Sequence, residues 1–435
     1  MKFESIFNSM QEKLTNFLMP IATKLGNQRH LDAVRQGITI LIPLTIIGGF
    51  SILLAQPPVN PETMTDSNFF FKFLLTWYNW ANANSSVLML PYNLTFGLIS
   101  IYVSFSVAYR LAEKYNLPKI ESGFTSMLCF LSISSIIQST DAGNVLTMEN
   151  LSATGMFTAI IIAILTVEIS HVFFKYNITI KMPASVPPNV ASPFKILIPM
   201  IFNIVGLILL NLLCIHLSGD TLCNLLLHLL QPLLSASESL PSILLLLLLS
   251  QCFWFFGIHG DNMIGAVLTP ITTSNIALNL EAYNAGQEMT HIFAGSFHGI
   301  WAGWTMQWAM LIAMLIIAKS QHLKKLSHLA PVSTLFNINE PLVFGTPTVL
   351  NSMIIIPQLA ILIFNITVAY IFTYFNIIGK CFMVLPWTTP APIAAFLTMM
   401  DIKALFLWIG LLIIDIFIML PFVKMYDKSL IEDEK

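Results

Sequence analysis

Amide and carboxyl side chains lie inside one otherwise apolar stretch, LFNINEPLVFGTPTVL, at residues 335–350. The stretch places Asn337, Asn339 and Glu340 directly before Pro341. Amides and carboxylates offer several hydrogen bonds each, which suits the many donors and acceptors of sugar hydroxyls. A cation site would instead need more carboxylates or carbonyls. The stretch therefore favours a site for a neutral, hydroxyl-rich ligand, with Glu340 and Asn339 as candidate binding residues.

A second stretch, FWFFGIHGDNMIG at residues 253–265, places His259 and Asp261 between glycines. Because glycine lets backbone come close to a ligand, His259 and Gly260 are candidate binding residues too. Ionisable residues within the membrane indicate functional sites, and Glu340 with His259 would also suit a proton relay. The proton relay therefore stays open, as does a purely structural role for His259. The sequence does not determine whether Asp261 pairs with His259.

Trp387, in the stretch LPWTTPAP, is the third candidate. An aromatic face packs against the apolar face of a pyranose ring, whose hydroxyls point sideways. Trp77, Trp80 and Trp408 fit the aromatic belt at a membrane interface, whereas helix-breaking prolines flank Trp387. We therefore expect Trp387 to stack against a bound sugar.

No metal site and no cofactor site is predicted. His291 and His298 are seven residues apart, which is too loose for a chelating pair, and no third ligand accompanies them. The chain contains no glycine-rich phosphate loop and no nucleophile constellation. Its cysteines lie scattered in apolar surroundings, which indicates packing residues rather than a disulfide framework. They are Cys129, Cys214, Cys223, Cys252 and Cys381.

The elements that position these residues are predicted to be membrane-spanning helices. The 435-residue chain is 56% hydrophobic and 10% charged, with a mean hydropathy of +0.77. Soluble domains carry about 25% charged residues, so most of this surface cannot face water. About 20 apolar residues suffice to cross the ~30 Å hydrocarbon core. The clear spans are 37–55, 88–109, 123–138, 153–174, 196–217, 241–257, 292–318, 352–376 and 404–423. A tenth, weaker span is expected at 260–279.

Basic residues predict the orientation of these spans. The loop 56–71 contains no basic residue, whereas the loops Arg110–Lys119 and Lys175–Lys195 are rich in them. Cytoplasmic loops carry an excess of Lys and Arg, so the N-terminus is expected in the cytoplasm. Ten spans then return the C-terminus to the cytoplasm, where Lys424 and Lys428 lie.

Two regions, 330–350 and 379–400, are apolar but broken by prolines and glycines. Non-helical backbone at membrane depth survives only where it is buried in protein or lines a watery cavity. Such segments are typical of transporter binding sites, although ordinary surface loops remain the alternative. Residues 1–36 are expected to form a cytoplasmic amphipathic segment.

Taken together, these stretches resemble one family. The motif NINEP…FG.P.VLN, the loop motif VPPNV and the stretches WFFGIHG and WTTPAPIAAFL carry the resemblance, which runs nearly end to end. The chain resembles the membrane-embedded sugar-translocating subunit (enzyme IIC) of the phosphoenolpyruvate-dependent phosphotransferase system, in its lactose, cellobiose and diacetylchitobiose branch. The resemblance implies an all-α polytopic protein of the bacterial cytoplasmic membrane. About ten transmembrane helices and two re-entrant hairpins would form an elevator-type sugar transporter.

The resemblance also implies how the chain is organised and what it binds. Residues 37–220 would form the interface half of a homodimer, residues 221–430 the sugar-binding transport half, and residues 431–435 a charged tail. The family's partners are a disaccharide, the phosphocarrier proteins IIB and, indirectly, IIA, and the lipid bilayer. No nucleic acid partner is expected.

The site residues of the family carry over position by position. Its sugar-site histidine corresponds to His259, its glutamate to Glu340 and its stacking tryptophan to Trp387. The implied function is the import of a β-linked disaccharide for phosphorylation by a separate IIB protein. The chain would not be an enzyme on its own, and Glu340 and His259 would only position the acceptor hydroxyl.

One stretch departs from the family pattern. Residues 302–309 read AGWTMQWA, with Trp304 and Trp308 where the family usually carries small residues. The exchange could narrow a cavity, alter domain packing or change which sugar fits. The identity of the β-linked disaccharide therefore stays open.

Two other classes of function compete with this interpretation. A proton- or sodium-coupled secondary sugar transporter could use the same pair, Glu340 and His259. A membrane-bound glycosyltransferase would need a metal-binding acidic motif, but the clustered acids at 432–434 form only a solvated tail.

Overall fold

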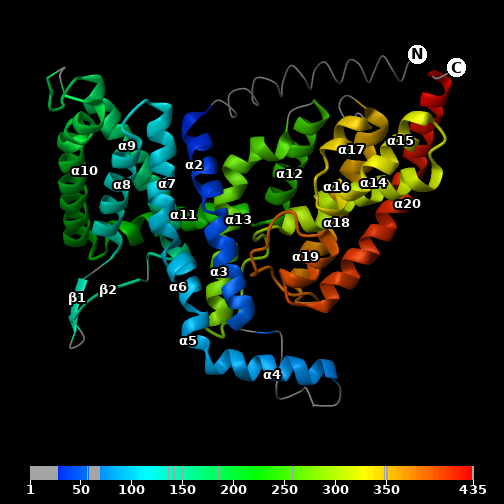
Figure 1. Ribbon diagram of the computed structural model, residues 1–435, viewed down its shortest axis with the longest axis horizontal. Helices are drawn as coiled ribbons and strands as arrows, with labels where there is room; N and C mark the ends of the chain where they lie inside the picture. Colours follow the sequence, from blue (N-terminus) through cyan, green and yellow to red (C-terminus); the bar gives the residue numbers. More distant parts are fainter. Residues whose placement is uncertain are drawn as a thin grey trace. The chain divides into compact units, whose positions relative to one another are not determined.

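A computed structural model describes residues 28–55, 57, 69–135, 137–140, 143–148, 150–183, 186–256, 259–346, 348 and 351–433, and the statements below refer to these residues. The described chain is almost entirely helical (Figure 1). It divides into two compact units. Of the described residues, unit 1 comprises Gln28 and those within Ala236–Leu268 and Asn279–Lys435, and unit 2 comprises those within Arg29–Ser235 and Thr269–Leu278.

Unit 2 is built mainly from helices of the first half of the chain. They are α2 (Arg29–Ile40), α3 (Ile42–Ala55), α4 (Phe69–Ala83), α5 (Ser85–Leu88), α6 (Leu90–Thr95), η1 (Phe96–Leu98), α7 (Ile99–Lys114), α8 (Lys119–Ser134), η2 (Ala153–Gly155), α9 (Met156–Lys175), α10 (Pro188–Ser218) and α11 (Leu222–Ser237). Two short antiparallel strands, β1 (Ile137–Thr140) and β2 (Gly143–Leu146), pair Ile137 with Leu146 and Thr140 with Gly143. The predicted span 123–138 therefore ends earlier than expected, because α8 stops at Ser134 and β1 begins at Ile137.

Small and hydroxyl-bearing residues let the helices of unit 2 pack closely. Gly37 of α2 faces α7 so tightly that a Cβ atom there would lie 2.8 Å from Val107. Ser104 of α7 and Ser126 of α8 share a buried hydrogen bond of 2.7 Å. Helix interfaces in membranes are rich in such small residues because apolar surface alone gives no drive to associate there.

Unit 1 combines long helices with short, interrupted ones. They are α12 (Leu240–Phe255), the two ends of α13 (Gly260–Asn284), the π-helix η3 (Gly299–Gly303), α14 (Trp304–Ile317), α15 (Gln321–Leu329), α16 (Pro331–Leu335), α17 (Glu340–Gly345), α18 (Ser352–Tyr374), α19 (Ala391–Leu397) and α20 (Ile402–Asp433). A hydrophobic core joins α14, α15, α17, α18 and α20 through residues such as Met310, Leu323, Leu342, Ile361 and Met419.

The turn between α14 and α15 is fastened to α20 by one carboxylate. Asp427 accepts hydrogen bonds from the backbone N–H groups of Lys319 and Ser320 at 2.9–3.0 Å, and from Ser320 Oγ at 2.7 Å. Ser320 Oγ in turn accepts the N–H of Leu323 and caps α15. Three backbone donors before and within the first turn of α15 are thereby satisfied.

Seven helical segments of the described chain are long and apolar enough to cross a membrane, so the chain is a multi-pass membrane protein. They are Arg29–Ser51, Ser85–Lys114, Ala153–Lys175, Pro193–Ser218, Gly299–Ile317, Met353–Tyr374 and Ile402–Glu432. The three other predicted spans fall on α8 and α12, of 16 residues each, and on α13, which carries many polar residues. The count of ten spans therefore stays a prediction.

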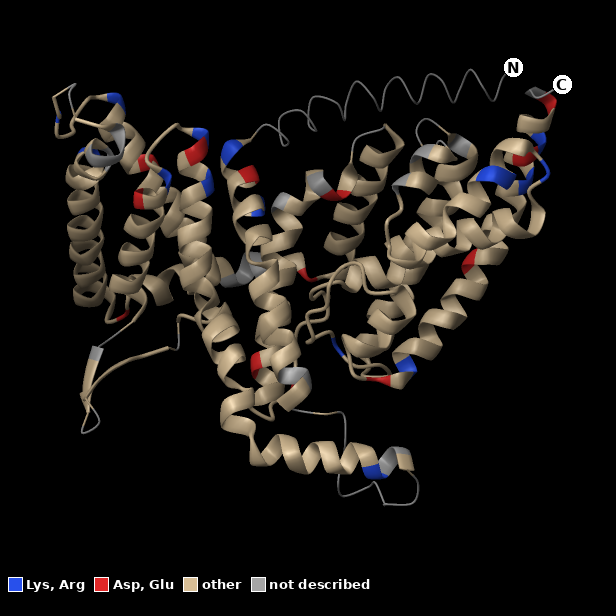
Figure 2. Ribbon diagram, in the orientation of Figure 1, with Lys and Arg blue, Asp and Glu red and all other residues tan. Residues whose placement is uncertain are grey.

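Charged residues gather at helix ends, where water can solvate them (Figure 2). At one end of α2 and α7, Asp32 is paired with Arg35 at 2.8 Å and with Lys114 at 2.5 Å. Within unit 1, basic residues gather on α15 and on the last turns of α20. The long apolar helix bodies between these ends fit a bilayer interior.

Both regions that the sequence marks as broken are interrupted in the structure. Residues 336–339 separate α16 from α17, and Asn337 has a positive φ of 61°. Residues 379–390 contain no helix, and α19 begins only after Pro390. Proline at the first position of α16 and at the second position of α17 explains why each helix begins where it does.

Candidate functional site

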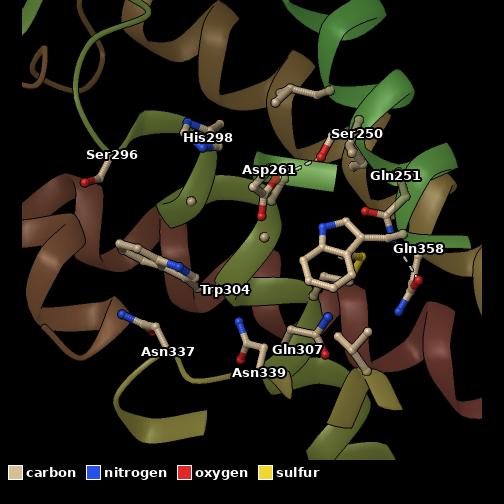
Figure 3. A pocket seen from close by; sticks show the side chains of 18 of the residues that line it. Ser250, Gln251, Asp261, Ser296, His298, Trp304, Gln307, Asn337, Asn339 and Gln358 are labelled. Atoms are coloured by element: carbon tan, nitrogen blue, oxygen red, sulfur yellow. Dashed lines mark hydrogen bonds between the residues drawn. The ribbon is translucent and has the colours of Figure 1, made fainter. Parts of the chain in front are cut away.

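Unit 1 contains a pocket of about 540 Å³ (Figure 3). Small-molecule sites typically enclose about 300–1,000 Å³, so the pocket has room for such a ligand. Its walls are contributed by α12, the start of α13, the η3–α14 segment, the two broken regions and α18. The lining residues are Leu247, Ser250, Gln251, Trp254, His259, Asp261, Gly295, Ser296, His298, Gly299, Ala302, Gly303, Trp304, Met306, Gln307, Asn337, Asn339, Val343, Thr348, Gln358, Leu362 and Trp387.

The junction of α12 and α13 brings one histidine and one aspartate to the pocket. Ser250 Oγ donates a hydrogen bond of 2.8 Å to Asp261 Oδ1, and the ring of His259 lies 4.2 Å from that of Trp254. Gly260 is required for this approach, because a Cβ atom there would lie 2.0 Å from the carbonyl oxygen of Ser250. The glycine therefore acts through close packing of the chain rather than through a lining side chain.

An amide pair joins α12 to α18 at another wall. Gln251 Nε2 donates to Gln358 Oε1 at 2.9 Å, and both side chains are buried (Figure 3). The amide nitrogen of Gln358 has no hydrogen-bond partner within the described structure, and the residue lines the pocket. Both N–H donors of this nitrogen therefore remain for a ligand after the helix-to-helix bond has formed.

The two broken regions meet at Asn337. Its amide nitrogen donates to the carbonyl oxygens of Trp387 at 2.8 Å and Thr389 at 2.7 Å. Trp387 lines the pocket and its side chain is 54% exposed. Segments more than 40 residues apart in the sequence thus form one wall of the pocket.

The η3 segment forms a further wall and places an aromatic ring in the pocket. The backbone N–H of Trp304 bonds to the carbonyl oxygen of Gly299, the i→i+5 pattern of a π-turn. The indole of Trp304 packs against Gly299, where a Cβ atom would lie 2.9 Å from it. Such π-turns inside α-helices recur at functional sites.

Six buried polar atoms around this pocket have no hydrogen-bond partner within the described structure. They are His298 Nδ1, Gln307 Oε1, Asn337 Oδ1, Asn339 Oδ1, Thr348 Oγ1 and Gln358 Nε2. A buried polar group without a partner costs about 1–3 kcal/mol. A ligand rich in hydroxyl groups would remove that cost, because each hydroxyl both donates and accepts.

The structure brings most of the predicted site residues together. His259, Asn339 and Trp387 line the pocket, and Gly260 lies directly behind it. Glu340 directly follows the lining residue Asn339 and begins α17. The side chain of Glu340 lies outside the part of the chain that the structure describes.

Several lining residues were not among the predicted site residues. Gln251, Gln307 and Gln358 come from the apolar helices α12, α14 and α18, and Asp261 and His298 were not assigned a binding role. Isolated polar residues in apolar runs were the signal available, since the membrane interior makes an unpartnered amide costly. Among the described residues, no group of three or more His, Cys, Asp or Glu side chains is arranged to hold a metal ion.

Comparison with known proteins agrees with this architecture. Residues 35–361 match the family model described as phosphotransferase system, EIIC. The oligo-beta-mannoside-specific EIIC component of Bacillus subtilis (strain 168) is 31% identical, over 98% of this chain and 96% of that protein. The lactose-specific EIICB component of Lacticaseibacillus casei is 29% identical, over 97% of this chain and 72% of that protein.

A solved structure shows the same fold. The transporter ChbC, the IIC component from the N,N'-diacetylchitobiose-specific phosphotransferase system, superposes with a TM-score of 0.86. The two chains are 29% identical, and the match covers 97% of this chain and 99% of ChbC. The broken helices, the polar pocket and the family match over three quarters of this chain lead to one conclusion: this chain belongs to the EIIC family of the phosphotransferase system, whose members are membrane-embedded, sugar-specific transport components.

Proposed function

We propose that this chain imports a β-linked disaccharide through the unit 1 pocket and delivers it for phosphorylation by a separate IIB protein. The observation that carries the proposal is the set of six unpartnered polar atoms beside aromatic rings in one pocket. Hydroxyls satisfy the polar atoms, and the apolar face of a pyranose ring suits an indole. The substrates named for the relatives, which include oligo-beta-mannosides, lichenan, lactose and N,N'-diacetylchitobiose, support a β-linked sugar.

Within this function, His259, Asn339, Trp387 and Glu340 are proposed to contact the sugar, and Gly260 to let the backbone approach it. His259 and Glu340 are proposed to orient the acceptor hydroxyl toward the phosphoryl donor, which accelerates transfer by positioning. The phosphoryl group itself would come from IIB, so the chain is not an enzyme alone. Four residues of this set lie in or against one pocket, which supports a shared role.

The proposed setting is the bacterial cytoplasmic membrane, with both termini in the cytoplasm and two copies of the chain forming a homodimer. The transport half would slide as an elevator against the interface half. Basic residues at the helix ends of each unit support a cytoplasmic position for those ends. The N-terminal amphipathic segment proposed for residues 1–36 lies mostly outside the described residues.

The test is uptake of a radiolabelled panel of β-disaccharides by cells that express this chain with and without its IIA and IIB partners. We expect intracellular sugar phosphate for at least one sugar, only when the partners are present. Trp387→Ala should abolish this uptake, while Trp80→Ala in unit 2 should leave it intact. Accumulation of unmodified sugar that an uncoupler abolishes would instead identify a proton-coupled secondary transporter.

A further inference from the structure

We infer that Asn337 is a clamp that positions Trp387 and at the same time binds a ligand hydroxyl. Its amide nitrogen holds the turn at residues 387–389. Its buried amide oxygen has no partner within the described structure, and the residue lines the pocket. The inference rests in part on the proposed function, because the hydroxyl would belong to the transported sugar. The clamp itself is a property of the ligand-free protein.

The backbone around Asn337 sets the direction of its side chain. The N–H of Asn337 bonds to the carbonyl oxygen of Thr334 at 3.0 Å, and the N–H of Ile338 bonds to that of Ser333 at 2.9 Å. These bonds close the last turn of α16, and Asn337 leaves it with a φ of 61°. Asparagine and glycine occupy this left-handed region more readily than other residues. The residue therefore ends α16 and is directed across to the second broken region.

Both donors of the amide are committed to that region. They bond to the carbonyl oxygens of Trp387 and Thr389 at 2.8 and 2.7 Å, and the N–H of Thr389 closes the turn onto Pro386 at 2.9 Å. The Trp387 side chain is 54% exposed, so packing alone holds it loosely. The amide fixes the backbone from which the indole extends, and so fixes where the ring can meet a sugar.

Only the acceptor of the amide remains for a ligand. Asn337 is 5% exposed, and its Oδ1 atom has no partner within the described structure. A group that can only accept selects for an O–H donor and against a bare acceptor such as an ether oxygen. Hydrogen bonds that follow one another in a network polarise each other. A ligand hydroxyl that donates to Oδ1 therefore strengthens the two hydrogen bonds that Nδ2 donates to the turn. Ligand binding therefore tightens the contact between the two broken regions.

Two substitutions at Asn337 distinguish the hydrogen bonds of its side chain from the effect of its left-handed backbone conformation. Asn337→Gly keeps the left-handed backbone but removes both hydrogen bonds to the turn and the proposed bond to the ligand. Asn337→Asp keeps the size but replaces the amide donors with an acceptor. Asn116→Gly is the matched control, because Asn116 also has a positive φ of 53° and lies in unit 2. Each variant is purified as the full chain in detergent.

The first measurement needs no sugar. Hydrogen exchange of the peptide that covers residues 386–392 should rise about 10-fold in Asn337→Gly and Asn337→Asp, and stay unchanged in Asn116→Gly. Unchanged exchange in both Asn337 variants would overturn the clamp. This readout stands even if the unaltered chain binds no sugar, a result that would refute the proposed function instead.

The second measurement compares the binding of a parent disaccharide with that of its monodeoxy analogues. The unaltered chain should lose about 10-fold in affinity for the analogue that lacks the hydroxyl bound by Oδ1. Asn337→Gly should bind the parent sugar about 10- to 100-fold more weakly than the unaltered chain does. It should also bind the parent sugar and the analogue that lacks this hydroxyl with equal affinity. The hydroxyl contact would be overturned if Asn337→Gly lost the same factor of affinity for the parent sugar and for every analogue. Unchanged affinity of Asn337→Gly for the parent sugar would overturn it as well.

Discussion

The helix packing of unit 2 and the pocket walls of unit 1 place similar polar side chains in different surroundings. Between α9 and α10, Asn203 donates to the carbonyl oxygen of Thr166 at 3.2 Å and to Ser170 Oγ at 3.1 Å. Between α7 and α8, Ser104 and Ser126 satisfy one another. These side chains join helix to helix, which is the ordinary use of hydroxyls and amides inside a membrane.

Asn203 Oδ1 has no partner within the described structure either, but Asn203 does not line the unit 1 pocket. Around that pocket, half-satisfied side chains of the same types are gathered on one cavity. Gln358 and Asn337 each make contacts within the protein and keep one atom for the pocket. Gln307 Oε1 and Asn339 Oδ1 have no partner within the described structure. The comparison teaches that a buried polar residue in this chain marks a site only where its bonding capacity remains open toward a cavity.

The largest expected loss of stability comes from replacing either of two tightly packed glycines by alanine. This pair of substitutions tests whether the pocket depends on close packing of the backbone. A Cβ atom at Gly260 would lie 2.0 Å from the Ser250 carbonyl oxygen in unit 1, and one at Gly155 would lie 1.9 Å from that of Asn150 in unit 2. Either Gly→Ala change should destabilise the protein by about 3 kcal/mol, because overpacking moves backbone. Thermal unfolding in detergent measures this loss.

Sugar affinity should separate the two glycine variants. In the protein that remains folded, Gly260→Ala should weaken sugar binding at least ~10-fold. Gly155→Ala should leave the sugar affinity of the folded protein unchanged. Equal affinity in both variants would show that the contact between α12 and α13 does not shape the pocket.

A buried amide behind the pocket gives the next largest effect. Asn365 donates to Asp415 Oδ2 at 2.7 Å and to the carbonyl oxygen of Trp301 in η3 at 2.9 Å. Asn365→Leu should cost about 2–3 kcal/mol, because it leaves a buried carboxyl and a buried carbonyl without their donor. Thermal unfolding measures the cost, and sugar affinity should also fall, since η3 lines the pocket.

Asn203→Leu in unit 2 is its counterpart, because Asn203 also donates two buried bonds. We expect a similar loss of stability with no change in sugar affinity. If Asn203→Leu weakened binding as much as Asn365→Leu, the division between packing polar groups and pocket polar groups would be wrong.

A smaller effect of opposite sign is expected for a pocket amide. Gln307→Leu removes a buried acceptor that has no partner within the described structure. It should leave the ligand-free protein equally stable or raise its stability by about 1 kcal/mol, while sugar affinity falls about 10-fold. Ser104→Ala should do the reverse, lowering stability by about 1 kcal/mol with affinity unchanged. Melting curves with and without sugar measure both quantities, and a stability loss in Gln307→Leu would contradict the comparison.

The smallest effect is expected at an exposed ion pair. Lys119 Nζ donates a hydrogen bond of 2.7 Å to Glu113 Oε1, and this bond to a carboxylate raises the pKa of the lysine. A raised lysine pKa stabilises the folded state below the unfolded-state pKa, and the contribution is lost as pH rises through the folded-state pKa. Glu113→Gln should therefore leave the melting temperature near neutral pH almost unchanged, since exposed pairs contribute little. A loss of several degrees would show that this helix end is less solvated than its exposure indicates.

The sequence predicts the candidate site better than it predicts the elements around it. Prolines beside polar residues at 335–350 and 379–400 locate the broken regions, because proline removes a backbone donor and the membrane interior tolerates few unsatisfied groups. Asn339 and Trp387 were predicted from these broken regions, and His259 from the glycines around it, and all three line one pocket. Helix α4 and the β1–β2 pair were not predicted from the sequence. The division of the chain before α7 into α5, α6 and η1 was not predicted either. These features follow from local turns that hydropathy does not record.

By itself, the sequence determined the class of protein, since a chain with 10% charged residues and repeated apolar runs must place its surface in lipid. It also determined which segments could not be plain helices. Only the tertiary structure decided which polar groups are used up in packing and which remain open. That distinction depends on hydrogen bonds between residues such as Asn337 and Trp387, 50 positions apart. No local pattern records such a bond, because its geometry exists only after the helices have packed.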